Sequence, residues 1–540
     1  MRIVLLVLRG LPCATLHRVI DFDVIVVGAG GSGAPLAARL SEDSWRSVLL
    51  LEAGPTPTTT SDFAPELQHS GSMKAAMPGH INNWSFLANL TPHRPYVVAR
   101  GRVLGGSTTI NGSYFVRARE HDFDRWSTGG NDEWSYRNVL PFYQKLETDL
   151  HMPGGNIHGA SGPMIVSRPP QNHPVTLAFK AAAAELGFAE EADKNDQSPP
   201  GYGPLPMNSV DSVRWNTGIA YINPIRHRSN LTVQGQTLVL RVVFENKKAV
   251  GVEIERDGDR SIIRGGEIVL SAGSVKSPHI LMLSGVGPQE ELARYDIPVV
   301  HHLPGVGKRF TDHPNITVNW LPRRDLNDRS TSQSMAAVHH FTSTNQPNDR
   351  SQAGDLEILP LLKPIDFLLT GDSNHDVLSF LVALQSETSR GNISLASANP
   401  TVQPQIDYNY LSTAADRARL REGIRTAVSI LKSQAFSALF ERLTELDSDT
   451  VESDDRLDQW MLGHIGTAIH LCGSAQFGPP GDPNTVVDQY GRVHGVTNLR
   501  VADTSILPSA PVRGPAATAV LIGELIASFM RRETPAHQPQ

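Results

Sequence analysis

The sequence predicts an α/β fold with two domains whose segments alternate along the chain. A chain of 540 residues is longer than one simple hydrophobic core accommodates, which indicates two domains. Near the start, two apolar runs flank a glycine-rich turn and a helical stretch, the pattern of a parallel βαβ unit. In the middle, residues 237–244 and 249–255 surround a polar turn and predict a pair of strands.

The composition, with 40% hydrophobic and 19% charged residues, is typical of a globular protein. The net charge of −7 and the scattered Lys and Arg residues give no electrostatic footprint for nucleic acid, so we expect no such partner. The two cysteines exclude a disulfide framework and favour a reducing, cytoplasmic compartment. No run of about 18 apolar residues occurs, so we expect no transmembrane segment, although peripheral membrane contact stays open.

The βαβ unit carries a nucleotide-binding motif. The strand at 22–27 runs into Gly28, Gly30 and Gly33, a helix at 34–40 follows, and a second strand ends at Glu52. The glycines allow a tight turn, close approach of a pyrophosphate and close helix–strand packing, and the carboxylate can accept from ribose hydroxyls. An acid at this position disfavours a 2′-phosphate but does not separate NAD from the ADP half of FAD.

Two other features leave alternatives open. The stretch at 99–120 places Gly105 and Gly106 before several hydroxyl groups and Asn111, which suits either a loop along a phosphate chain or a structural turn. The segment TAIHLCGSAQFG contains His470, which is either a catalytic base or a buried core histidine.

The histidine pairs at 301–302 and 339–340 lack metal-ligand spacing, so we expect these histidines in loops or at the surface and predict no metal site.

Taken together, these segments resemble a known family. Residues 99–120 and 271–288 resemble the two fingerprints of the glucose–methanol–choline (GMC) family of FAD oxidoreductases. Further similar segments begin at residues 158, 303, 389 and 491, so the resemblance extends from about residue 20 to residue 530.

The resemblance implies a Rossmann-like FAD-binding domain of the GMC/glutathione-reductase type and an interleaved α+β substrate domain with an antiparallel sheet. The FAD-binding domain would be assembled from residues 21–170, 225–315 and 480–533. The substrate domain would consist of residues 171–224 and 316–479.

The resemblance also implies the cofactor contacts. Val239 should offer its backbone to the adenine, and Asp503 should lie near the ribityl–phosphate region. Gly105, Gly106 and Asn111 should follow the diphosphate and isoalloxazine. Some members attach FAD through a histidine directly before that asparagine, but Ile110 stands here and cannot form the bond, so we expect non-covalent FAD.

The family's active-site histidine falls on His470, which we predict to be the general base that takes the alcohol proton while hydride passes to flavin N5. A second active-site residue, usually Asn or His, falls on Gly514, which has no side chain to offer. The guanidinium of the neighbouring Arg513 could hold an anionic oxygen or a carboxylate, or it could face solvent or the flavin. Catalysis could therefore rest on His470 alone, or on His470 together with Arg513 or His464.

The predicted substrate is a small-molecule CH–OH donor. It could be a small or choline-like alcohol, a sugar, or reduced mycofactocin, because the segments RGPAATAV and LETDLHMPGG resemble the mycofactocin-associated branch of the family. The electron acceptor is either a quinone-like carrier or dioxygen. A lyase on the same fold and a non-catalytic flavin carrier stay as alternatives, whereas the lack of a G-x-S-x-G elbow excludes a serine hydrolase.

Overall fold

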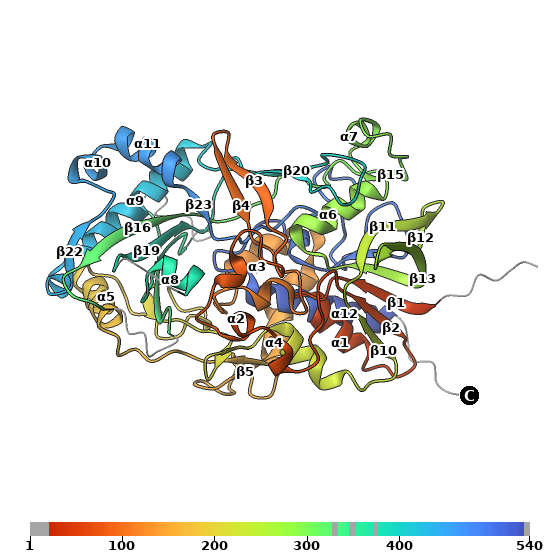
Figure 1. The fold of residues 1–540 in the computed structure, drawn as a ribbon, viewed down its shortest axis with the longest axis horizontal. Coiled ribbons are helices and arrows are strands. Elements are labelled where there is room, and N and C mark those ends of the chain that lie inside the picture. Colours follow the sequence, from red (N-terminus) through yellow and green to blue (C-terminus); the bar gives the residue numbers. More distant parts are fainter. Residues whose placement is uncertain (1–20, 327–332, 345–352, 372–375, 534–540) are drawn as a thin grey trace, which may run out of the picture.

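The computed structural model describes residues 21–326, 333–344, 353–371 and 376–533. Residues 1–20, interpreted from the sequence as a leader that is disordered or misassigned, lie outside this description. Two large sheets lie toward opposite ends of the long axis, and helices and loops fill the middle (Figure 1). None of the helices in the described ranges is long and apolar enough to cross a membrane.

The first sheet unites three distant parts of the chain. Its strands run in the order β10 (Leu231–Gln234), β2 (Val48–Leu51), β1 (Phe22–Val27), β13 (Asp259–Leu270), β12 (Lys248–Arg256) and β11 (Leu238–Glu245), and β24 (Leu499–Val501) also pairs with β13. The pairs from β10 to β13 and the pair β13–β24 are parallel, whereas β11 to β13 form an antiparallel meander. The strands predicted from the sequence are confirmed with ends shifted by about one residue, and the sheet is Rossmann-like.

Helices α1 (Gly33–Leu40) and α12 (Ala516–Glu533) pack against each other beside this sheet (Figure 1). A Cβ on Gly523 would lie 2.2 Å from the carbonyl oxygen of Ser32, so glycine allows the two backbones to approach. The Ser32 hydroxyl donates to the carbonyl of Ala519 at 2.6 Å. The four residues Val24–Val27 of β1 are at most 3% exposed, and burying such a side chain contributes roughly 1.5–3 kcal/mol.

The second sheet is antiparallel throughout, as the resemblance implied. Its order is β22 (Phe440–Leu443), β16 (Pro314–Pro322), β19 (Leu378–Leu384), β18 (Leu356–Pro360), β17 (Ala337–Phe341) and β7 (Tyr202–Pro204), and β23 (Gly466–Thr467) also pairs with β16. Helices α5 (Pro174–Glu185) and α9 (Ala414–Leu431) pack against it.

The expectation that the histidine pair at 339–340 lies in a loop or at the surface is wrong. All five residues of β17 are buried, including His339 and His340. An interior strand covered on both faces does not alternate between polar and apolar residues, so the sequence pattern gave no sign of its burial. The pair His301–His302 forms the short strand β15, where the first is half-buried and the second exposed.

A four-stranded sheet, in the order β20 (Asn392–Ser394), β21 (Gln405–Asp407), β3 (Phe86–Thr91) and β4 (Arg94–Val98), joins segments from both predicted domains. The other short strands are β5 (Glu147–Asp149), β6 (Met164–Val166), β8 (Ser209–Val210), β9 (Val213–Arg214) and β14 (Val286–Gly287). The other helices are α2 (Pro65–Gln68), α3 (Glu120–Trp126), α4 (Tyr136–Leu146), α6 (Gly273–Leu283), α7 (Gln289–Ala293), α8 (Ile365–Thr370), α10 (Ser448–Glu452) and α11 (Asp454–His464). The exact domain boundaries stay a prediction.

Candidate active site

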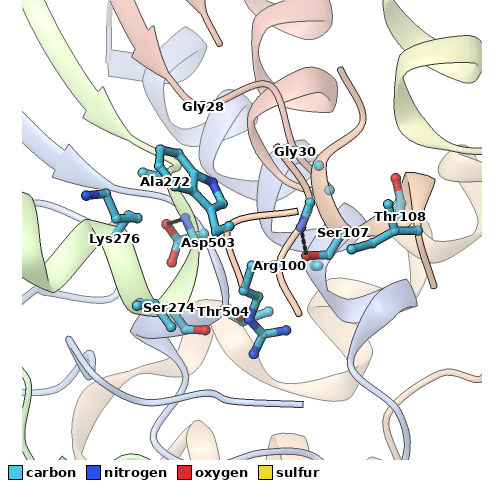
Figure 2. A pocket seen from close by; sticks show the side chains of 18 of the residues that line it. Gly28, Gly30, Arg100, Ser107, Thr108, Ala272, Ser274, Lys276, Asp503 and Thr504 are labelled. Carbon is cyan, nitrogen blue, oxygen red and sulfur yellow. Dashed lines mark hydrogen bonds between the residues drawn. The ribbon is translucent and has the colours of Figure 1, made fainter. Parts of the chain in front are cut away.

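A cavity of about 320 Å³ runs along the carboxyl ends of β1 and β2 (Figure 2). Its walls come from residues 27–32, 51–53, 99–114, 237–239, 271–276, 468–471 and 503–519, together with a few side chains from 73–86 and Ile280. Each of the three predicted FAD-binding segments contributes, and so does the loop that carries His470. The position matches the rule that open α/β sheets bind ligands at the carboxyl ends of their strands.

The turn after β1 forms one end of the cavity. Gly28 has a φ of +100°, and a Cβ there would lie 2.5 Å from the carbonyl oxygen of Ser271. The carboxylate of Glu52 accepts from the amides of Ala29 at 3.1 Å and Gly54 at 3.0 Å, and burial raises its pKa to about 7. Gly30 and Val239 also line this cavity, and their contacts with the pyrophosphate and the adenine stay a prediction. Gly33 lies behind the wall, where a Cβ would collide with the carbonyl oxygen of Gly28 at 1.9 Å.

The second glycine-rich segment touches the first. Gly105 and Gly106 have φ values of +88° and +53°, and a Cβ on Gly106 would lie 2.7 Å from the Cα of Gly30. The amide of Gly105 donates to the carbonyl of Ala29 at 2.8 Å. Gly106 and Asn111 line the cavity, whereas Gly105 shapes the turn behind it. Residues 99–114 therefore form part of the cavity wall in addition to a structural turn.

Cationic groups also face the cavity (Figure 2). Arg100 donates through Nη1 to the carbonyl of Ile469 at 2.7 Å, while its Nε and Nη2 are buried without a hydrogen-bond partner in the described part of the chain. Burial lowers the pKa of Lys276 to about 8. The Nζ of Lys276 lies 3.1 Å from Nδ1 of His279, so Arg100 is the cation here with nitrogens left for a ligand. A guanidinium with such nitrogens favours an anionic ligand, and a nucleotide with a diphosphate fits it.

Asp503 anchors the first turn of α6 at the same wall. Its carboxylate accepts from the amide of Gly273 at 2.9 Å and from the Ser277 hydroxyl at 2.5 Å. Burial raises its pKa.

His470 lies at the other end of the cavity and is half-buried. Its Nδ1 is 2.9 Å from Nδ1 of His313, which is fully buried in the segment leading into β16, and the two rings cross at 83°. Burial lowers the pKa of His313 to about 3 and that of His470 well below its usual range. Two neutral imidazoles can share such a bond, with one Nδ1 donating and the other accepting. The remaining nitrogen of His470, Nε2, is left for a ligand in the cavity.

Asp312 holds the backbone of this histidine pair. Its Oδ1 accepts from the amide of His313 and from the amide of His470, each at 2.6 Å. Burial raises the pKa of Asp312 to about 6, although Arg100 and the two amides oppose the shift. Ile469, next to His470, has a φ of +63°, which is a strained conformation for a β-branched residue and is typical of functional sites.

Of the three residues considered from the sequence as neighbours of His470, Gly514 lies at the cavity, whereas Arg513 and His464 do not. Gly514 lines the cavity, and a Cβ on it would lie 3.3 Å from Cε1 of His470. Arg513 does not line it: its buried guanidinium donates to the carbonyls of Gly354 and Val512 and lies 3.9 Å from Glu191. His464 is exposed at the end of α11, where its Nδ1 contacts the carbonyl of Trp460. The suggested direct role of these two side chains is therefore not supported by the geometry.

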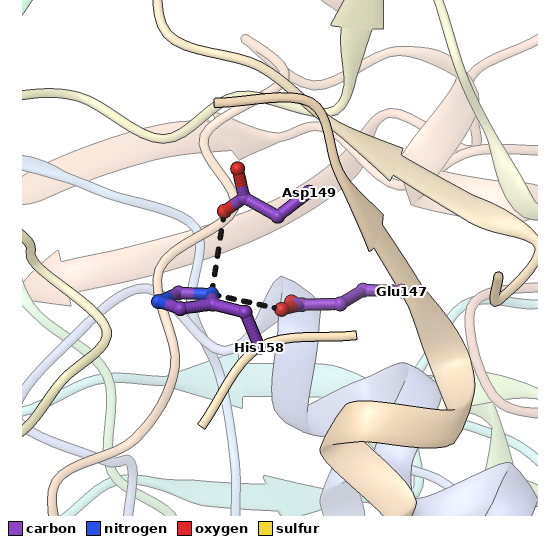
Figure 3. Close-up of side chains that lie close together, drawn as sticks. All are labelled: Glu147, Asp149 and His158. Atoms are coloured by element: carbon purple, nitrogen blue, oxygen red, sulfur yellow. Dashed lines mark hydrogen bonds and ion pairs between the residues drawn. The ribbon is translucent and has the colours of Figure 1, made fainter. Parts of the chain in front are cut away.

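A second group of titratable side chains lies outside the cavity (Figure 3). Nδ1 of His158 is 3.1 Å from Glu147 and 3.3 Å from Asp149, and these three could hold a metal ion. Arg117 pairs with Glu147, and Arg168 pairs with Asp149 at 2.7 Å. Nε2 of His158 contacts Asp193 at 2.6 Å. Burial alone would lower the pKa of His158, but its carboxylate partners raise it to about 9. The charges of this cluster balance without a metal.

The fold and the cavity are those of a Rossmann-like nucleotide-binding protein, and comparison with known proteins shows the family. Two models of the GMC oxidoreductase family match residues 22–315 and 387–523. The chain therefore belongs to the GMC oxidoreductase family, whose members bind FAD.

Relatives align over nearly the whole chain. An uncharacterized GMC-type oxidoreductase of Rhodococcus erythropolis is 37% identical over 94% of this chain and 98% of its own length. The mitochondrial choline dehydrogenase of Mus musculus is 33% identical over 98% of this chain and 95% of its own. The crystal structure of pyridoxine 4-oxidase from Mesorbium loti superposes with a TM-score of 0.86 and 26% identity, covering 95% of this chain and 100% of that one.

Proposed function

We propose that this protein is an alcohol-oxidising enzyme that removes hydride and proton from a CH–OH group, with non-covalent FAD and with His470 as the general base. The observation that carries the proposal is the His313–His470 pair at the cavity wall, where Nδ1 of His470 is bound at 2.9 Å and Nε2 is left for substrate. A positioned base of this kind typically contributes about 10²–10⁴-fold to a rate.

The residues present fit FAD. The diphosphate would lie against the backbone of Gly30 and Gly106, and Glu52 would accept from the ribose of the adenosine half. When bound, FAD supplies the acceptor for the hydride. Ile110 stands at the position of the covalent attachment in other members and has no nucleophilic atom. Acid precipitation should therefore release all flavin into the supernatant, and flavin retained in the pellet would contradict non-covalent binding.

His470 carries the proton step. Its low pKa keeps the imidazole neutral near pH 7, so that Nε2 is available to take the hydroxyl proton. His313 fixes the ring orientation through Nδ1, and Asp312 fixes the backbone of both residues. Each of these contacts is made before substrate arrives, and catalytic groups that are already held in place lower the barrier of the reaction.

The substrate is a small-molecule alcohol, and the candidates are a small or choline-like alcohol, a sugar, or reduced mycofactocin. The similarity to choline dehydrogenase and pyridoxine 4-oxidase supports an alcohol donor in general terms. We propose that a quinone-like carrier or dioxygen reoxidises the flavin. We propose a cytoplasmic location, which the presence of only two cysteines favours, and peripheral contact with a membrane surface as the route to a quinone-like acceptor.

Anaerobic titration of the FAD-loaded protein tests the proposal. Primary alcohols, choline, sugars and reduced mycofactocin are added one at a time while the flavin absorbance near 450 nm is recorded. Bleaching by one or more of them is the expected result. Bleaching by reduced mycofactocin alone assigns the mycofactocin branch. Cyanohydrin cleavage without bleaching would replace the oxidase proposal by the lyase alternative, and a protein unable to retain FAD would contradict both.

A further inference from the structure

The ring of Tyr114 fills the space that a side chain at position 514 would need. Tyr114 and Gly514 both line the cavity. A Cβ on Gly514 would lie 3.0 Å from Cδ1 and Cε1 of Tyr114 and 3.3 Å from Cε1 of His470. Because contacts this short force a neighbour to move, a larger residue at 514 would displace either the Tyr114 ring or the His470 ring. The two rings and Gly514 thus meet at one point of the wall.

The hydroxyl of Tyr114 is held on the side of the second sheet. It donates to Oε2 of Glu357 at 2.8 Å and lies 3.1 Å from Nε2 of His340. Glu357 on β18 and His340 on β17 are cross-strand neighbours whose side chains are 2.9 Å apart. Burial, and then the adjacent Glu357, raise the pKa of Tyr114 well above its usual value, so the hydroxyl stays a donor. These contacts fix the ring in place and leave its apolar surface for the cavity.

Apolar side chains pack behind this ring, away from the cavity. Tyr114 packs against a small hydrophobic cluster that includes Val116, Leu205 and Met335. Met73 also packs against this cluster and lines the cavity beside it. A Cβ on Gly112 would lie 2.9 Å from Cε of Met335, so this part is closely packed. The Tyr114 ring and Met73 are the apolar side chains of this group that line the cavity, and an apolar substituent of a ligand gains free energy by covering them.

We propose that Tyr114 is a specificity-determining residue, whose ring is the surface against which an apolar substituent of the alcohol packs, and that glycine at 514 leaves the room for it. The inference rests on the proposed function and names its substrate class: an alcohol with an apolar, alkyl or aryl group beside the carbinol carbon. Tyr114 takes the place that a polar side chain at 514 would occupy, and the proton step is left to His470.

Selectivity among alcohols is the first test. FAD-loaded wild type, Tyr114→Ala and Tyr114→Phe are reduced anaerobically with benzyl alcohol and with the larger 2-naphthylmethanol. Removing the ring enlarges the site, so Tyr114→Ala should raise the rate ratio of the larger over the smaller alcohol by about 10-fold. Tyr114→Phe should raise KM with little change in kcat, because the ring remains and only the contacts of its hydroxyl with Glu357 and His340 are lost. Tyr295→Phe, whose hydroxyl bonds to Leu395 away from the cavity, is the matched control and should leave both values unchanged. An unchanged ratio in Tyr114→Ala would overturn the proposal.

A double-mutant cycle tests the steric relationship independently of turnover. The probe is 2-phenyl-2-propanol, which has no carbinol hydrogen and cannot be oxidised, and its Kd is read from the perturbed flavin spectrum. Gly514→Ala alone should weaken binding by about 10-fold, and in the Tyr114→Ala background it should have little further effect. The inference would be contradicted if the fold-change in Kd of the double variant equalled the product of the fold-changes of the two single variants. An unchanged Kd in Gly514→Ala would contradict it as well. If no alcohol reduces the wild-type flavin, the proposed function fails while this Kd cycle still decides the role of Tyr114. Retained FAD absorbance confirms that each variant is folded.

Discussion

The Nδ1 atoms of His313 and His470 lie 2.9 Å apart, although the residues are separated by 157 positions in the chain. This contact joins the start of β16 to the loop after β23, and the backbone pairing of these two strands brings the histidines together. The structure thus gives His470 a side-chain partner where position 514 offers none. The predictions below follow from this pair and from the groups around the cavity.

Replacing His313 should slow the reaction without emptying the flavin site. His313→Phe keeps the volume but removes the hydrogen bond that orients His470, so the rate of flavin reduction should fall by about 10–100-fold, less than the loss of a base itself. Stopped-flow reduction by the best alcohol measures this rate. His464→Ala, at an exposed site on α11, should behave as wild type. Wild-type rates in His313→Phe would show that the pair has no role in positioning.

The pH dependence of flavin reduction should reflect Asp312 rather than His470. The pKa of His470 is lowered far below 6.5 by burial, so this base stays deprotonated across the neutral range. Burial raises the pKa of Asp312 to about 6, and its protonated form is a weaker acceptor for the two histidine amides. The rate should therefore fall as the pH drops through about 6, and Asp312→Asn should lack this limb. A limb that persists unchanged in Asp312→Asn would assign it to another group.

The turn after β1 should tolerate no side chain at its first glycine. Gly28→Ala places a Cβ 2.5 Å from the carbonyl oxygen of Ser271 at a φ of +100°, so the purified variant should contain little or no FAD. The absorbance ratio of flavin to protein measures the content. Gly258→Ala is a matched control, because its φ is +88° but no atom lies within 4 Å of the added Cβ. Equal FAD content in the two variants would contradict the steric explanation.

The cluster around His158 should make stability depend on pH. Its folded-state pKa of about 9 lies above the ordinary 6.5, so the free energy of unfolding contains a contribution that is full below about pH 6.5. That contribution is lost as the pH rises through about 9. The Tm should therefore fall between pH 6.5 and 9.5, and His158→Gln should show a smaller fall. Because Arg117 and Arg168 already occupy the carboxylates, EDTA should leave the Tm unchanged; a large drop with EDTA would indicate a bound metal.

Local patterns predicted the strands, the helix and the glycine-rich turn at one end of the cavity. The strand Phe22–Val27, its three glycines and Glu52 lie within about thirty residues, and the βαβ geometry requires them at fixed spacing. The hairpin of β11 and β12 was found for the same reason, since both strands and their turn are contiguous. Such features are formed by residues that are close together in the chain, so a single sequence is sufficient to predict them.

The other end of the site could not be derived in this way. His313 was missed because its role arises from a contact made across two strands, and the segment containing it suggested only family membership. The direction of Arg513 stayed open because adjacency to Gly514 in sequence says nothing about side-chain direction, and in the structure its guanidinium lies 3.9 Å from Glu191. The one available signal for His313 was its place at the end of the polar stretch 307–313, directly before the strand at 314–322.

The most direct test of the account is the reduction rate of His470→Ala carrying a full complement of FAD. Under anaerobic conditions, a single turnover with saturating alcohol isolates the step in which the base acts. If His470 is the base, the rate should be about 10²–10⁴-fold below wild type with unchanged FAD content and Tm. A variant that retains its flavin and is reduced at a rate close to wild type would show that His470 is not the base.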